Sequence, residues 1–136
     1  MRLDLQKKKR RGATVVEVAV VSPLIFLLVF AGIEFGRLMM ATHGLEEAAR
    51  EGCRAAVLND VTYADVQTAV DARLATFGVS GHTMTTVPAQ PETALQWEPV
   101  TVNIAVPYSG VSWLPTPTFL GGIVLSASCT LSKESE

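Results

Sequence analysis

An apolar stretch near the amino terminus constrains this chain more than any other feature of its sequence. Residues 13–35 contain only two ionisable side chains, Glu17 and Glu34, and residues 18–33 carry no charge. At 1.5 Å per residue, a helix over residues 13–35 is about 34 Å long, which exceeds the hydrocarbon core of about 30 Å. The sequence therefore predicts a single transmembrane helix over residues 13–35.

A cluster of basic side chains precedes the apolar stretch. Residues 1–12 hold six Lys and Arg against Asp4, so the whole-chain charge of −2 divides into +5 for this segment and −7 for the remainder. Basic flanks stay cytoplasmic, which predicts an extracytoplasmic location for residues 36–136. The adjacent apolar run favours this topology over nucleic-acid binding, and it is longer than the apolar core of about 7–15 residues in a signal peptide.

The length of the chain limits what the exported part can be. With 136 residues and one span, about a hundred residues remain for a folded module, which excludes a large enzyme, a repeat array and a polytopic transporter. Disorder of the whole chain is also excluded, because 49% of the residues are hydrophobic and 18% are charged. We therefore expect one small extracytoplasmic module on a membrane anchor.

Several motifs follow one another in the first 58 residues. A basic leader ends at Gly12, and Glu17 is the fifth residue after it. Pro23 with Leu24, Ile-Glu-Phe-Gly-Arg at 33–37 and Ala-Ala-Arg-Glu-Gly at 48–52 come next. Together these residues resemble the type IV prepilin family, and within it the TadE-like proteins of tight-adherence (Flp, type IVb-like) pilus systems. The residue after Glu17, often aromatic in such proteins, is Val18.

The resemblance implies a processed pilus subunit. A prepilin peptidase would cut between Gly12 and Ala13, and the product would be a minor pilin or pseudopilin of the cytoplasmic membrane. Its partners would be that peptidase, other pilin-like subunits and the pilus or secretion assembly platform. In such an assembly, Glu17 is expected to pair with the Ala13 ammonium of a neighbouring subunit, because an unpaired carboxylate is costly in apolar surroundings.

Beyond the membrane, the helical periodicity continues, and we expect one helix from about Thr14 to Leu58. Its apolar positions recur at three- and four-residue steps, and Gly44, Ala48 and Gly52 repeat every four residues. Small residues at this spacing let another backbone approach closely. The stripe is predicted either to lie on the chain's own module or to contact another subunit.

The remaining residues predict a small α+β module. Thr62 and Asp65 form an N-cap pair for a second amphipathic helix that ends at Gly78. Three alternating segments, at 82–87, 100–108 and 123–131, are typical of strands, with loops at 88–99 and 109–122. The predicted divisions are a leader at 1–12, a transmembrane helix at 13–35, its extramembrane continuation at 36–58 and a module with a small antiparallel sheet at 59–136.

Two cysteines are expected on the exported side of the membrane. Cys53 falls on the long helix, and Cys129 falls on the inward face of the last predicted strand. Thiols outside the cytoplasm can oxidise, so the pair is predicted either to form a disulfide or to remain as two buried thiols.

No catalytic constellation is recognisable in the sequence. His43 and His82 are isolated, and phosphate-loop, nucleophile-elbow and metal-ligand spacings are absent. We therefore expect no enzymatic activity, cofactor, bound metal or small-molecule substrate. The alternative to a pilin is an uncleaved, single-pass, membrane-anchored binding protein that recognises an extracytoplasmic ligand through Trp97, Trp113 and Phe119.

Overall fold

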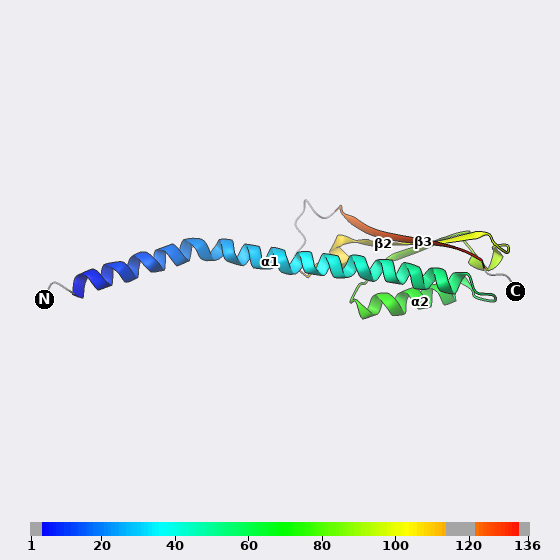
Figure 1. Cartoon of the computed structure of the whole chain (residues 1–136), viewed down its shortest axis with the longest axis horizontal. Coiled ribbons are helices and arrows are strands. Elements are labelled where there is room, and N and C mark those ends of the chain that lie inside the picture. The colour runs from blue at the N-terminus through cyan, green and yellow to red at the C-terminus, as the bar shows by residue number, and fades with distance from the viewer. Residues whose placement is uncertain (1–3, 114–121, 134–136) are drawn as a thin grey trace. The chain divides into compact units, whose positions relative to one another are not determined.

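The computed structural model describes residues 4–113 and 122–133, without the side chains of residues 4–11 and 13. The chain divides into two compact units, Met1–Phe35 and Gly36–Glu136. The described elements are two α-helices, two short 3-10 helices and three strands, which confirms the α+β class (Figure 1). We call the two units unit 1 and unit 2.

Helix α1 (Asp4–Ala56) is 53 residues long and continues through Pro23. It begins ten residues before the predicted Thr14, because residues 5–11 are leucine, glutamine, lysine and arginine, which all favour helix. It ends two residues before the predicted Leu58, where the chain turns and Asp60 adopts a φ of 61°. The predicted long helix is therefore confirmed, with different ends.

Within the described residues, unit 1 is the part of α1 up to Phe35, which includes the apolar stretch. The helix from Thr14 onward is long and apolar enough to cross a membrane. Its most apolar 18-residue window has a mean hydropathy of 2.5, and none of the residues in that window is buried. Large apolar side chains between Val15 and Phe35 are 44–72% exposed. Exposed apolar surface on this scale needs an apolar environment, so it supports membrane anchoring through this helix.

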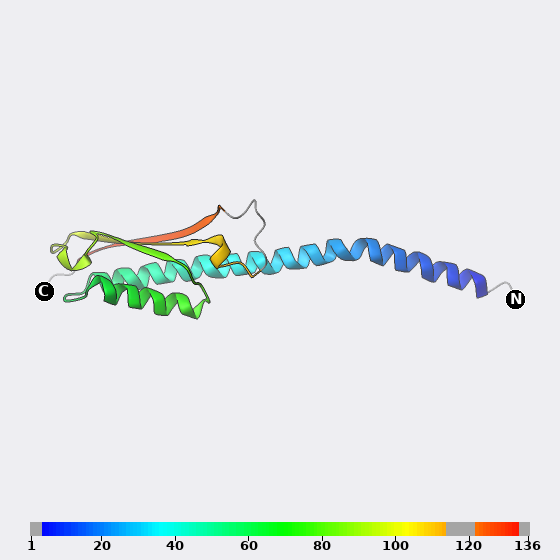
Figure 2. The same ribbon diagram turned by 180° about the vertical axis from the view of Figure 1, so that it is seen from behind.

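Unit 2 is built around a three-stranded antiparallel sheet in the order β1-β2-β3. Its strands are β1 (Thr83–Val87), β2 (Pro99–Pro107) and β3 (Val124–Ser132). Figures 1 and 2 show the strands extending alongside the carboxyl-terminal part of α1, with α2 (Tyr63–Thr76) beside the same part. The loop predicted at 88–99 contains a 3-10 helix, Pro91–Thr93, and a second one, Tyr108–Gly110, follows β2.

The core of unit 2 forms where both helices meet the central strand. The alternation predicted for β2 is confirmed, because Val100, Val102, Ile104 and Val106 are fully buried. Opposite them, α2 contributes the fully buried Val66, Val70 and Leu74. The predicted inward face of β3 is confirmed only in its middle: Leu125, Ala127 and Cys129 are half-buried, whereas Ile123 precedes the strand and Leu131 is 42% exposed.

The predicted cap of α2 is also confirmed. The Asp65 backbone donates to the Thr62 hydroxyl, and the Thr62 backbone donates to an Asp65 carboxylate oxygen at 2.9 Å. Hydrogen bonds from the Thr62 side chain and backbone lower the pKa of Asp65. This reciprocal capping box satisfies amide groups that the first turn of a helix leaves without partners.

The small-residue stripe of α1 lies on the chain's own module. Gly44, Ala48 and Gly52 are all buried. A Cβ atom at Gly44 would lie 2.7 Å from Cγ of Phe77, and one at Gly52 would lie 2.7 Å from Cγ2 of Val70. The close helix approach that the spacing predicts is therefore made inside unit 2, and this face of α1 is not available to another subunit.

Candidate functional site

Arg37 is a buried cation in the first turn of unit 2, and its side chain is hydrogen-bonded to three backbone carbonyls. Its Nη1 donates to Phe77 O at 2.5 Å, its Nη2 to Gly78 O at 2.7 Å and its Nε to Val111 O at 3.0 Å. The residue is only 4% exposed. Its guanidinium carbon also lies 5.3 Å from the centre of the Trp113 ring.

The carbonyls that Arg37 binds are favourable partners for a cation. Phe77 caps the carboxyl end of α2, and Gly78 follows it with a φ of 62°, so carbonyls at this helix end are turned away from the helix. The carboxyl end of a helix carries partial negative charge, and hydrogen bonds from a charged donor are stronger than neutral ones. Arg37 thereby connects α1, the end of α2 and the turn after β2.

Sequence reasoning did not assign this role to Arg37. Backbone carbonyls are its acceptors, and no residue type marks a carbonyl in a sequence. One signal was present, because a positive charge directly after a span on the exported side runs against the positive-inside rule. A cation at this position therefore indicates a structural interaction within the protein.

A second buried cation lies near the carboxyl end of α1. Lys133 is 7% exposed, and its Nζ donates to Leu58 O at 3.1 Å and to Pro91 O at 3.4 Å. Its backbone carbonyl accepts from the Trp97 amide at 3.2 Å. Lys133 thus holds the last described residues of the chain against the end of α1.

Cys53 and Cys129 are brought together, as the sequence suggested, by α1 and β3. Cys53 is fully buried and Cys129 is half-buried; both are free thiols, and they lie within hydrogen-bonding reach of each other. Burial, reinforced by the neighbouring Cys129 thiol, raises the pKa of Cys53 to about 12. At neutral pH the folded protein therefore holds Cys53 as an unreactive thiol, and the disulfide stays a prediction.

Gly12 and Glu17, which are predicted to act in processing and assembly, lie on the exposed surface of α1. Gly12 is exposed, and a Cβ built there would have no atom within 4 Å. Ala13 belongs to the same helix, one turn before Glu17, which is exposed and lines a shallow groove with Val18, Val21, Ser22 and Ile25. Among the described residues, none forms a hydrogen bond or ion pair with the Glu17 carboxylate, so any partner must come from outside this part of the chain.

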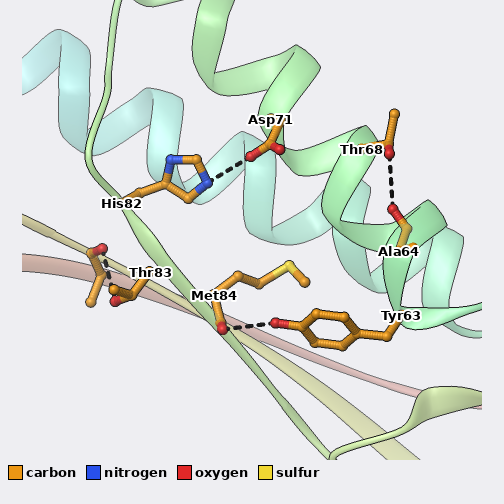
Figure 3. Close-up of polar contacts among 8 residues, drawn as sticks. Tyr63, Ala64, Thr68, Asp71, His82, Thr83 and Met84 are labelled. Atoms are coloured by element: carbon orange, nitrogen blue, oxygen red, sulfur yellow. Dashed lines mark hydrogen bonds and ion pairs between the residues drawn. The ribbon is translucent and has the colours of Figure 1, made fainter.

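The histidines act in local contacts. His82 Nε2 lies 2.8 Å from Asp71 Oδ1, and the Tyr63 hydroxyl donates to Met84 O at 3.1 Å, so two polar contacts join α2 to β1 and the residue before it (Figure 3). His43 is exposed and lies 4.0 Å from a Glu46 carboxylate oxygen. In the described part of the chain, no three His, Cys, Asp or Glu side chains are close enough together to hold a metal ion.

An open groove between the two helices is lined by charges of both signs. Its volume is about 580 Å³, and its walls include Glu47, Arg50, Glu51 and Arg73. Glu47 and Arg73 pair directly across it. Side chains of both signs line this groove in solvent, and they present no convergent set of groups for one substrate.

The aromatic residues proposed for ligand recognition do not gather at one place. The Trp97 amide donates to the carbonyl of Lys133, whose side chain binds Leu58 O after the end of α1. Trp113 instead stacks against Arg37, which lies two residues after the apolar stretch. Along α1, Arg37 and Ala56 are separated by about 28 Å. Phe119 lies outside the described residues. The two described tryptophans therefore cannot form a single recognition surface.

Replacing Arg37 should destabilise unit 2 far more than replacing an exposed arginine of the same helix. Arg37→Met leaves three carbonyls without their donor, and we expect a loss of about 3–5 kcal/mol of unfolding free energy in denaturant titrations of the detergent-solubilised chain. Arg37→Lys should lie between, because one ammonium cannot reproduce the planar fork. The control is Arg50→Met, since the Arg50 side chain is 69% exposed; equal losses for Arg37→Met and Arg50→Met would contradict the assigned role.

Comparison with known proteins gives one family. No curated protein and no solved structure matches the chain. Residues 12–54 match the family described as TadE-like protein, a segment that begins at Gly12 and ends two residues before the end of α1. It includes Glu17, Arg37 and the small-residue stripe. The match confirms the resemblance of the amino-terminal motifs, and the chain carries the TadE-like helix over residues 12–54.

Proposed function

We propose that this protein is a TadE-like minor pilin or pseudopilin that takes part in assembly of a tight-adherence (Flp, type IVb-like) pilus or a related secretion apparatus. The observation that carries the proposal is the family match, which starts at Gly12, covers the apolar helix and continues into unit 2. The match begins at the residue where the leader is predicted to end, which supports the proposed processing point. The described groove with mixed charges favours a structural role over a catalytic one.

The proposed location is the cytoplasmic membrane, with a single span. The exposed apolar side chains of unit 1 support insertion in lipid. The +5 charge of residues 1–12 favours a cytoplasmic amino terminus, which places unit 2 on the extracytoplasmic side. The subunit then acts either within the fibre or in the membrane complex that builds it.

Processing by a prepilin peptidase between Gly12 and Ala13 would change both the charge and the terminus of the subunit. Gly12 lies inside a helical segment, where glycine costs up to about 1 kcal/mol relative to alanine, so the helix is locally weak at the scissile bond. Cleavage would remove the +5 leader that favours the cytoplasmic surface. It would also create an ammonium group at Ala13.

The Glu17 carboxylate is proposed to pair with this ammonium on a neighbouring subunit. Glu17 is exposed on α1, so a second helix can approach it directly. In an apolar environment an unpaired carboxylate is unfavourable, and a pair that forms only at one axial offset sets the register between subunits. Glu17 is thus an assembly residue in this proposal, and it takes no part in bond cleavage.

Oxidation of Cys53 and Cys129 is proposed to bridge α1 to β3. The two thiols would lose two electrons and two protons to a disulfide-exchange oxidant of the extracytoplasmic space. Because Cys53 is fully buried in the folded module, the bridge is expected to form while unit 2 folds. It would close a loop of about 76 residues and stabilise the protein by about 4 kcal/mol in the chain-entropy model.

Processing is tested by the amino terminus of the protein purified from its native membrane. Intact mass and amino-terminal sequencing should show a chain that starts at Ala13. A Gly12→Leu variant should retain Met1, because the side chain required at the end of the leader is absent. A wild-type chain that starts at Met1 would support the uncleaved, membrane-anchored binding protein instead.

The assembly role of Glu17 is tested by Glu17→Ala. This variant should insert in the membrane at the normal level, since removal of a charge does not oppose insertion, but it should lose incorporation into the pilus or co-purification with its partner subunits. Glu92→Ala, which removes an exposed carboxylate of unit 2, is the matched control and should behave as wild type. Normal pilus assembly by Glu17→Ala would contradict the assembly role of Glu17.

The disulfide is tested by intact mass under non-reducing conditions. The exported protein should be lighter by two hydrogen atoms than the reduced chain and should resist alkylation after unfolding, whereas Cys53→Ala should expose one alkylatable thiol at Cys129. If both thiols of the native protein are alkylated after unfolding without a reductant, the protein carries a buried dithiol in place of the bridge.

A further inference from the structure

We propose that the Arg37 end of unit 2 contacts the lipid headgroup region directly, with Trp113 as its interfacial anchor and Arg37 as the residue that positions Trp113. This inference rests on the membrane anchoring in the proposed function. It goes beyond anchoring by one helix, because it assigns a lipid-contacting surface to the folded module itself. The partner is the same bilayer that α1 enters.

The first argument is the position of Trp113 along α1. Arg37 follows the last residue of the apolar stretch by two positions, or about 3 Å along the helix axis. Its guanidinium binds Val111 O at 3.0 Å and lies 5.3 Å from the Trp113 ring centre. The Trp113 ring is therefore held beside the side chain of Arg37, a residue that closely follows the apolar stretch in the sequence.

The second argument is exposure. Trp113 is 69% exposed although one face of its ring lies over Arg37, and Met40, whose sulfur lies 3.8 Å from Arg37 Nη1, is 49% exposed. Ile123 and Val124 are 42% and 59% exposed. Ile123 belongs to the same end, since its carbonyl accepts from the Tyr108 amide in the turn that carries Val111. Apolar side chains from three segments of unit 2 are thus exposed together.

The third argument is charge, which distinguishes the two ends of unit 2. Residues 106–113 and 122–128 contain no ionisable carboxylate or ammonium side chain. Arg37, a cation of this end, already donates to three carbonyls and is buried, and Glu34, the carboxylate three residues before it in α1, is half-buried. At the opposite end, Trp97 is adjacent to Glu98 and bonded to Lys133. A charged surface resists transfer toward hydrocarbon, so lipid suits the Trp113 end and does not suit the Trp97 end.

Tryptophan has the chemistry that an interface requires. Its ring is apolar, its Nε1 is a hydrogen-bond donor, and the residue is enriched at membrane–water interfaces for that reason. The Arg37 guanidinium holds one face of the ring, which leaves the remaining surface to the lipid. Arg37 positions the anchor and need not contact lipid itself.

The chain supplies its own control for the test, because it contains two tryptophans, one at each end of unit 2. Trp97→Phe leaves Trp113 as the single fluorophore, and Trp113→Phe leaves Trp97. Each full-length variant is reconstituted in phosphatidylcholine vesicles, either plain or brominated near the carbonyl end of the acyl chains, where bromine quenches tryptophan on contact. Trp113 should emit at shorter wavelength in vesicles and lose several-fold more intensity to bromine than Trp97.

The outcomes separate this inference from the proposed function. Flotation of each variant with the vesicles reports anchoring, and a chain that does not float contradicts both. A chain that floats but shows equal quenching of Trp113 and Trp97 overturns the lipid contact alone. Emission of Trp113 that is insensitive to bromine but changes with protein density would assign this end to a second copy of the chain, and would also overturn the proposal.

The role of Arg37 is tested in the Trp97→Phe background. Arg37→Lys keeps the positive charge but loses the planar contact with the ring, so bromine quenching of Trp113 should fall while flotation is retained. Far-UV circular dichroism should confirm that the variant keeps its helix and sheet content. Quenching that is unchanged in a folded Arg37→Lys variant would remove Arg37 as the positioning residue.

Discussion

The structure depends most on the hydrogen bonds of Arg37 to three backbone carbonyls. Arg37 is 4% exposed as a residue, and burial of its charge without hydrogen-bond partners would be strongly unfavourable. The end of α2 and the turn after β2 supply these partners as backbone carbonyls. The same side chain belongs to α1, a few residues beyond the apolar stretch. Arg37 is therefore the residue at which α1 begins to pack in the folded module.

Unit 2 is closed by a similar interaction at its other end. Lys133 donates to Leu58 O and Pro91 O, so a buried cation satisfies carbonyls beyond the end of α1 much as Arg37 does for α2. Between the two cations, Gly44 and Gly52 leave space for Phe77 and Val70, and the helices approach closely. Within unit 2, α1 is thus joined to the rest of the module by polar contacts at both ends and by close packing between them.

The groups proposed for processing and assembly lie outside this folded part. Gly12 and Glu17 are exposed on one helix and meet no described residue that would assign them a task. In the proposed function, these two residues act on groups that a peptidase and a second subunit supply. Unit 2 therefore has a packed core, whereas the apolar stretch of α1 leaves its large apolar side chains exposed.

The sequence by itself determined the elements that follow from local patterns: the spanning helix from its apolar length, the capping box of Thr62 and Asp65 from their spacing, and β2 from strict alternation. Each depends on neighbours within a few residues. Only the tertiary structure decided the roles of Arg37 and Lys133, the pairing of His82 with Asp71, and the internal use of the small-residue stripe. The bonds of Arg37 reach residues 40 to 74 positions away, and their acceptors are backbone carbonyls, which every residue carries. No side-chain pattern can therefore reveal them before the chain is folded.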